Sequence, residues 1–265
     1  MTNAALQEKL LDDIRREIDH IDDAIVDLLA RRIAAAERVR GQKFPAGGNA
    51  PSPIRPAREA TILRRLLGRA GDAVPADLLV RLWRIILTTS TLAQAPVTLH
   101  VARKLNQSLA LRLKLRDHFG PMPVEEHRDD AQVLTQVNIG MGDICAVETG
   151  SAWADAFCDG KSGEARVMAV LPVIGGAGEP DLLVFGHGQA QPSEDDETLV
   201  VTTGRLPRDF QPVPNWQRAS GRHWVSGLPG FLSEHESPLI SLVRSNAGLG
   251  LRIAGRYPRP IRVAS

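Results

Sequence analysis

The chain has 265 residues, of which 43% are hydrophobic and 24% are charged, and its formal net charge is +1. This composition is typical of a globular protein and excludes general disorder, while the small net charge argues against a nucleic-acid binder. The sequence contains no run of 18 apolar residues that could span a membrane, and its first residues lack the apolar core of a signal peptide. We therefore expect a cytoplasmic protein. Cys145 and Cys158 are too few for a disulfide framework and wrongly spaced for zinc, so we expect plain core residues and no metal.

The glycine content changes near residue 96. Only 5 of the 23 glycines precede this position, and Ala95-Pro96 is a place where a helix is expected to end. We therefore expect a multi-domain chain, with an all-α three-helix domain over residues 1–95 and an α+β domain over residues 96–265.

The first helix is predicted by a heptad pattern. Its positions step by four and three through Ile14, Ile18, Ile21, Ile25, Leu28, Arg32, Ala35 and Val39. No proline or glycine lies between Asn3 and Arg40, so one helix of roughly 38 residues would be about 57 Å long. Because so long a helix must extend beyond its own domain, we expect a second copy to cover it in a homodimer.

Two further helices follow a loop, GQKFPAGGNAPSPIRP, that is rich in proline and glycine. The second helix is predicted from about Pro56 to Leu67, and Gly68 and Gly71 are expected in the break after it. The third is predicted to begin within residues 72–77 and to end near Gln94. Its inward line is expected to contain Leu79, Trp83, Ile86, Ser90 and Gln94.

Polar residues interrupt the apolar faces of these helices. Arg32 occupies a position of the first seam, Lys43 follows it by three turns at nearly the same angle, and Ser90 and Gln94 share a face of the third helix. Each has an ordinary structural explanation, such as an ion pair or a fraying helix end, and Glu59 beside Arg58 could be a helix cap. Together they favour a bound anion, because a buried unpaired cation is costly.

Arg15 precedes Arg32 by 17 residues, which is about 260° around a helix. The two side chains therefore cannot reach one pocket within a single chain. If both bind the same anion, Arg15 must come from the partner chain.

This pattern resembles the all-helical bacterial chorismate mutases over residues 6–95. The matching stretches are IRREIDHIDDAIVDLLARRIAAAERVRGQK, REATILRRL and LWRIILTTSTLAQ. The resemblance implies that chorismate is the substrate and prephenate the product. It also implies an intertwined dimer. One position departs from the family pattern, because Arg55 stands where many members carry an acid.

The resemblance also implies a role for each polar residue. Arg15 of the partner and Arg32 would hold the two substrate carboxylates, with Ser90 assisting, and Arg58 would brace the site. Lys43 and Gln94 would donate to the ether oxygen of the breaking C–O bond, and Glu59 would accept from the ring hydroxyl. An intramolecular rearrangement needs positioning and electrostatic stabilisation, so no cofactor or metal is expected.

The region after Pro96 resembles a degenerate prephenate dehydratase followed by an ACT-type regulatory domain. Strands and helices are predicted around VTLHVA, AQVLTQVNIGMGDICAVE, ARVMAVLPVIGGAGEPDLLVFGHG and the segment from WVSGLPG to GRYPRPI. Pro180-Asp181-Leu182 stands where the dehydratase has Thr-Arg-Phe, so the resemblance implies that dehydratase activity is lost.

Three functions stay open at this point. The first is a dimeric chorismate mutase with a non-catalytic C-terminal domain, and the second is a non-catalytic regulatory or binding subunit of the aromatic pathway, which Arg55 favours. The third is a bifunctional chorismate mutase–prephenate dehydratase. Isochorismate pyruvate lyase shares the fold and its cations, but Glu59 and the long C-terminal region favour the mutase.

Overall fold

The computed structural model describes residues 3–43, 53–140, 142–176 and 178–263. The chain divides into two compact units, Met1–Asn49 and Ala50–Ser265. The second and third helices therefore belong to the same unit as the sheet, whereas the sequence groups them with the first helix. The domain boundary expected at residues 95 and 96 stays a prediction. Most of the predicted proline-rich loop lies outside the described residues.

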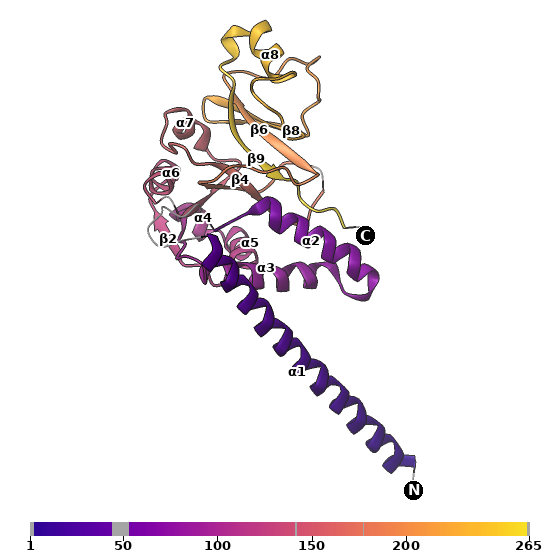
Figure 1. Ribbon diagram of the computed structural model, residues 1–265. Coiled ribbons are helices and arrows are strands. Elements are labelled where there is room, and N and C mark those ends of the chain that lie inside the picture. Colours follow the sequence, from indigo (N-terminus) through magenta and orange to yellow (C-terminus); the bar gives the residue numbers. More distant parts are fainter. Residues whose placement is uncertain (1–2, 44–52, 141, 177, 264–265) are drawn as a thin grey trace. The chain divides into compact units, whose positions relative to one another are not determined.

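The first unit contains one helix, α1 (Asn3–Lys43), which is 41 residues long and corresponds to about 60 Å (Figure 1). It confirms the single uninterrupted helix predicted from the heptad pattern. The described aliphatic seam residues Ile14, Ile18, Ile21, Ile25 and Leu28 are between 48% and 59% exposed. Within its own unit, α1 thus carries a continuous apolar stripe that no other element of that unit covers.

Two helices open the second unit. They are α2 (Pro56–Ala70) and α3 (Ala76–Leu92), joined by the 3-10 turn η1 (Gly71–Ala73). Both were predicted, but Gly68 lies inside α2 instead of in the break after it. α2 ends at Ala70, and the next residue, Gly71, has a φ of +51°, which lies in the region that favours glycine.

The remaining helices and strands form an α+β arrangement, as expected from the sequence. The helices are α4 (Arg103–Gln107), α5 (Leu109–Phe119), α6 (Asp130–Ile139), α7 (Trp153–Cys158) and α8 (Leu239–Ser245), and a 3-10 turn, η2 (Ala247–Leu249), follows α8. The strands are β1 (Leu99–Ala102), β2 (Val124–His127), β3 (Ile144–Glu148), β4 (Arg166–Leu171), β5 (Leu182–Gly186), β6 (Asp196–Thr202), β7 (Trp216–Ser220), β8 (His223–Pro229) and β9 (Arg252–Pro258).

These strands form one mixed nine-stranded sheet in the order β2-β1-β3-β5-β4-β9-β6-β8-β7. β1 runs parallel to both β2 and β3, and the other ladders are antiparallel except for a short parallel contact between β4 and β9. That contact needs glycine at Gly255, because a Cβ there would come within 2.0 Å of the Val167 carbonyl oxygen. The short contact joins the part of the sheet beside α4, α5 and α6 to the part beside α8 (Figure 1), and α7 contacts β7 and β8.

Apolar residues cover both faces of the sheet at β1, β3, β4 and β5, and the first of the two cores continues onto β6, β7, β8 and β9. One core contains Val133, Leu134 and Val137 of α6 with Trp153 and Phe157 of α7. A second core contains Leu105 of α4 with Leu115 and Phe119 of α5 and side chains from β1, β3 and β5. This part of the molecule therefore has three layers, with the sheet between two layers of helices.

The α2–α3 hairpin packs against the α+β part of its own unit. Leu63 of α2 and Val80 of α3 are buried together with Ile261, which follows β9. The Arg64 guanidinium donates to the carbonyl oxygens of Ser193 and Asp195. The hairpin is thus anchored to the α+β part by an apolar cluster and by a polar clamp.

Two smaller expectations concern cysteines and membranes. Cys145 is buried and Cys158 is half-buried, and both are free thiols, as expected for core residues. Burial raises the pKa of the Cys145 thiol, which keeps it protonated. Among the described residues, no helix is long and apolar enough to cross a membrane.

Candidate active site

The seven residues singled out from the sequence are divided between the two units. The first unit carries three of them on α1, namely Arg15, Arg32 and Lys43. The second unit carries Arg58 and Glu59 on α2, Ser90 on α3 and Gln94 just after α3. A site that uses all seven would therefore combine side chains of both units, and it stays a prediction.

The cations of α1 are spaced as an uninterrupted helix requires. Arg15 and Arg32 are 17 residues apart, so they are separated by about 25 Å along the axis and about 260° around it. Arg15 forms an exposed ion pair with Asp12, at 3.1 Å. Lys43 is the last residue of α1, and its side chain lies outside the described residues. Within one helix, Arg15 and Arg32 cannot contact one small anion.

Glu59 on α2 forms a buried ion pair with Arg84 on α3. The side chains are 13% and 7% exposed, and the Arg84 Nη1 group donates to Glu59 Oε2. Arg84 also donates from Nε to the carbonyl oxygen of His118, at 3.1 Å, which ties α3 to the end of α5. Glu59 is therefore a positioned, charge-compensated carboxylate within the hairpin, and not a solvated helix cap.

Arg84 was not singled out from the sequence. The sequence pattern predicts an inward face of α3 on the line through Trp83 and Ser90. In the structure α3 also buries Val80, Arg84, Leu87 and Thr91 against the rest of the unit. The available signal was an arginine amid apolar residues in LWRIIL.

His118, near the end of α5, lies next to the Glu59–Arg84 ion pair. Burial, together with the nearby charge of Arg84, holds its pKa well below the usual value, so the imidazole is neutral at pH 7. Its Nδ1 atom is buried and has no hydrogen-bond partner in the part of the chain that the structure describes. The cavity beside Glu59, Arg84 and His118 has a volume of about 40 Å³, which holds only a few water molecules. This cavity is too small for a dicarboxylate of the size of chorismate.

Ser90 and Gln94 make hydrogen bonds within and just beyond α3. The Ser90 hydroxyl donates to the Ile86 carbonyl oxygen at 2.7 Å, and the Gln94 amide donates to the Ser90 carbonyl oxygen at 3.0 Å. Both lie on the same face, as the spacing predicted. These are the contacts expected of polar residues near a helix end, and they compete with any contact to a ligand.

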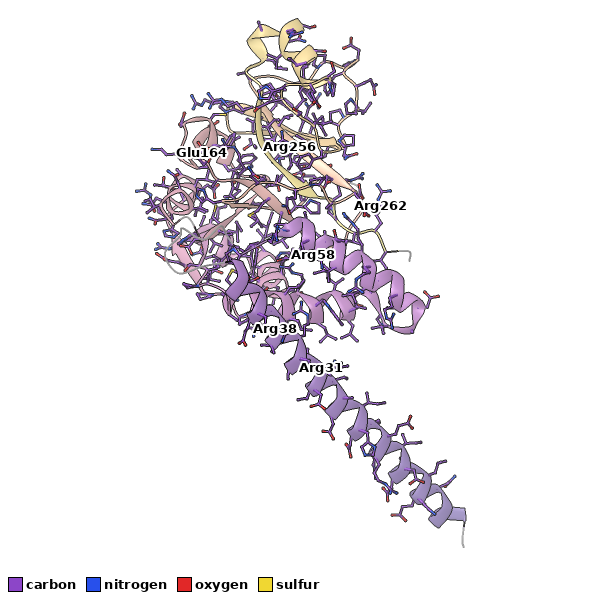
Figure 2. The ribbon with its side chains drawn as sticks, in the orientation of Figure 1. Arg31, Arg38, Arg58, Glu164, Arg256 and Arg262 are labelled. Atoms are coloured by element: carbon purple, nitrogen blue, oxygen red, sulfur yellow. The ribbon has the colours of Figure 1, made fainter. Side chains whose placement is uncertain are left out.

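Arg58 and Arg55 lie on the exposed side of the start of α2. Figure 2 shows Arg58 on α2, and it shows Arg31 and Arg38 on α1. Arg55, which departs from the family pattern, donates to the Gln191 side chain at 3.3 Å. The start of α2 therefore carries positive charge where the resemblance leads one to expect an acid.

The stretches that resemble prephenate dehydratase have other residues where that family has its Thr-Arg-Phe motif. Asp181 pairs with Lys114, and the next residue, Leu182, is buried at the start of β5. Thr149 is buried, and its hydroxyl has no hydrogen-bond partner among the described residues. In this structure Asp181 and Leu182 thus serve an ion pair and the apolar core.

Comparison with known proteins supports the assignment of the N-terminal segment. Residues 14–95 match the family model of chorismate mutase type II, which confirms the resemblance seen in the sequence. No curated protein matches the chain.

Two solved structures are similar to part of the chain. A prephenate dehydratase from Streptococcus mutans is 13% identical, with 64% of this chain and 100% of that chain covered and a TM-score of 0.36. A protein described as GqqA, a novel type of quorum quenching acylase, is 10% identical, with 62% and 95% covered and a TM-score of 0.35.

The buried ion pair generates a stability prediction. Arg84→Met removes the cation and leaves Glu59 buried without its partner, so the free energy of unfolding should fall by about 3–5 kcal/mol. Urea denaturation followed by circular dichroism measures this change. The double variant Glu59→Gln, Arg84→Met should recover part of the loss, because it removes the uncompensated charge.

Arg81→Met is the matched control. Arg81 is on the same helix, is 63% exposed and lies 3.7 Å from Asp117, so its replacement should change the free energy of unfolding by less than about 0.5 kcal/mol. A loss for Arg84→Met no larger than that of Arg81→Met would contradict the structural role of the pair.

Proposed function

We propose that this protein is a chorismate mutase that rearranges chorismate to prephenate as a homodimer, and that its C-terminal region has no dehydratase activity. The observation that carries the proposal is the match of residues 14–95 to chorismate mutase type II. Within that segment, the cations, the acid, the hydroxyl and the amide follow one another in the order and spacing of the family.

The exposed seam of α1 supports the dimer. Aliphatic side chains at heptad spacing that no other element of the first unit covers are typical of a surface that packs against another helix. A second copy offers the same seam, and a two-fold interface makes one surface complementary to itself. The dimer also resolves the geometry of Arg15, which cannot share an anion with Arg32 of its own helix.

The reaction itself needs little from the protein beyond electrostatics and shape. Two arginines hold the two carboxylates in the folded conformer, and planar guanidinium groups suit bidentate carboxylate contacts. Negative charge grows on the ether oxygen as the C–O bond lengthens, and Lys43 with Gln94 would donate to that atom. No proton transfer and no covalent intermediate are required.

The hydrogen bonds of the free chain are compatible with these roles. The Gln94 amide group carries two N–H bonds, so one can remain on the Ser90 carbonyl oxygen while the other reaches the substrate. Glu59 accepts from Arg84 at Oε2, and its Oε1 can accept from the substrate hydroxyl. In this arrangement Arg84 is a positioning residue for Glu59.

A non-catalytic binding subunit is the second candidate. It is favoured by Arg55, which adds positive charge where the family pattern has an acid, and by Ser90, whose hydroxyl is engaged by its own helix. A surface that binds chorismate-like anions without turning them over would retain Arg15 and Arg32 but would not need Gln94.

Purified protein incubated with chorismate distinguishes these candidates. The proposal predicts loss of chorismate and accumulation of prephenate, with no phenylpyruvate, when the products are separated by chromatography. Folded protein that binds chorismate without forming prephenate would support the binding subunit and contradict the proposal. Phenylpyruvate formed without added dehydratase would contradict the assigned loss of dehydratase chemistry.

Replacement of Gln94 tests the catalytic role at the ether oxygen. Gln94→Ala should lower kcat by about 10²–10³ because one preorganised donor is lost in the transition state. Gln94→Glu should regain activity as the pH falls towards the ordinary pKa of a glutamic acid, about 4.3, since only the protonated carboxyl donates. Steady-state kinetics between neutral and mildly acidic pH measure both effects.

The matched control is Thr89→Ala, at an exposed position in the last turns of α3, which should keep the parental rate. A kcat for Gln94→Ala within threefold of the parent, with folding intact, would remove Gln94 from the catalytic set.

A further inference from the structure

Three side chains with metal-binding chemistry meet at one edge of the sheet. His100 lies on β1, and Glu125 and His127 lie on the parallel edge strand β2, with His100 in register with Glu125. Residues two apart on a strand share a face, so Glu125 and His127 point to the same side, beside His100. Strand register therefore brings His100 beside a carboxylate and an imidazole that lie 25 and 27 residues further along the sequence.

The distances between the three groups suit a single small cation. His100 Nδ1 is 3.0 Å from His127 Nε2 and 3.8 Å from Glu125 Oε2, and His127 Nε2 is 3.9 Å from Glu125 Oε1. All the ligand atoms lie within 4.8 Å of one another. Ligands of tetrahedral zinc, at bond lengths of about 2.0–2.2 Å, are separated by roughly 3.3–3.5 Å. Shifts of a few tenths of an ångström would give each atom a place around one ion.

A fourth residue fixes the orientation of His100. Its Nε2 atom faces Asp143 Oδ2 at 3.3 Å, and the other Asp143 oxygen accepts from the Thr98 backbone N–H at 2.8 Å. A carboxylate behind an imidazole selects the tautomer that carries the proton on the nitrogen facing it. Here that arrangement leaves the Nδ1 lone pair directed towards His127 and Glu125, as a metal ligand requires.

The burial of the site leaves one side open. The His100 and His127 side chains are 6% and 10% exposed, whereas Glu125 is 60% exposed. The two imidazoles are fixed by the residues packed around them, whereas the exposed Glu125 carboxylate can bind an ion that arrives from solvent. Three protein ligands would also leave one tetrahedral position for water.

We propose that His100, His127 and Glu125 form a binding site for Zn²⁺, with Asp143 as a positioning residue and water as the fourth ligand. Two imidazoles with one carboxylate suit zinc and similar transition ions, whereas Mg²⁺ and Ca²⁺ take oxygen ligands. The ion would connect the edge strand β2 to β1. The site lies outside the proposed mutase site and does not depend on that function.

Zinc titration of the full-length chain tests this site. Protein without an affinity tag is stripped with a chelator, dialysed into metal-free buffer, and titrated with ZnCl₂ by calorimetry, with bound metal measured after gel filtration. We expect one Zn²⁺ per chain and a rise in Tm with Zn²⁺ but not with Mg²⁺. Glu125→Gln and His127→Asn should lose the bound equivalent and the rise in Tm, and Asp143→Asn should weaken binding by about 10–100-fold.

Two variants serve as matched controls. Glu126→Gln changes the adjacent carboxylate on the opposite face of β2, which accepts from Asn106, and His235→Asn changes an imidazole that is 85% exposed elsewhere. Both should bind zinc like the parent. Failure of the folded parent to bind one Zn²⁺ would overturn the proposal, as would binding that is unchanged in Glu125→Gln. Because Glu125 is largely exposed, its variant keeps the test valid if His127→Asn does not fold.

Discussion

The apolar seam of α1 needs a second surface to cover it. Each aliphatic side chain of the seam would contribute about 1.5–3 kcal/mol if it were fully buried, and no other element of the first unit covers the five described ones. A helix with so much apolar surface on one stripe is not expected to persist alone in water, because tertiary packing supplies most helical stability. The need to cover this seam links the length of α1, the proposed homodimer and the proposed donation of Arg15 to a partner's site.

The α2–α3 hairpin carries both packing residues and residues that are proposed to meet the substrate. One face carries Leu63, Val80 and Arg84 and is fixed to the α+β part by the apolar cluster, the Arg64 clamp and the contact with His118. Ser90, which is buried on α3, and Gln94 just after α3 are the residues proposed, together with Glu59, to meet the substrate. Consequently, the C-terminal region can affect the proposed site without contributing a residue to it, through the positions of Glu59 and Arg84. A cut near residue 95 would expose the apolar face, which gives the C-terminal region a structural role even without dehydratase chemistry.

Local patterns in the sequence predicted most of the secondary structure. The heptad spacing predicted α1, and glycine and proline positions predicted the approximate limits of α2 and α3. Gly68 was misplaced because one glycine is tolerated inside a helix when its neighbours pack well. The boundary between the two units could not be predicted in the same way. It depends on which side chains of α2 and α3 pack against the α+β part, and the periodic pattern of a helix does not say what each of its faces contacts.

The side-chain clusters were harder to predict than the elements. Glu59 was singled out, but its partner Arg84 was hidden by the apolar residues around it, since an ion pair between two helices leaves no local spacing signal. The group of His100, Glu125 and His127 was missed for a related reason. It arises from the parallel register of β1 and β2, which a single sequence does not specify. In both clusters, the residues come together through contacts between separate helices or strands, and the spacing of residues along the sequence does not predict those contacts.

Mixing two inactive variants provides the most direct test of a site shared across the α1 seam. Arg15→Ala and Arg32→Ala chains are prepared separately, each with a different tag, and subunit exchange is verified by co-purification before chorismate turnover is measured. If Arg15 acts in the partner's site, half of the dimers become mixed, each with one intact site of two, and activity should rise from near zero to roughly one quarter of the parental rate. Verified exchange without any recovery of activity would contradict the shared site.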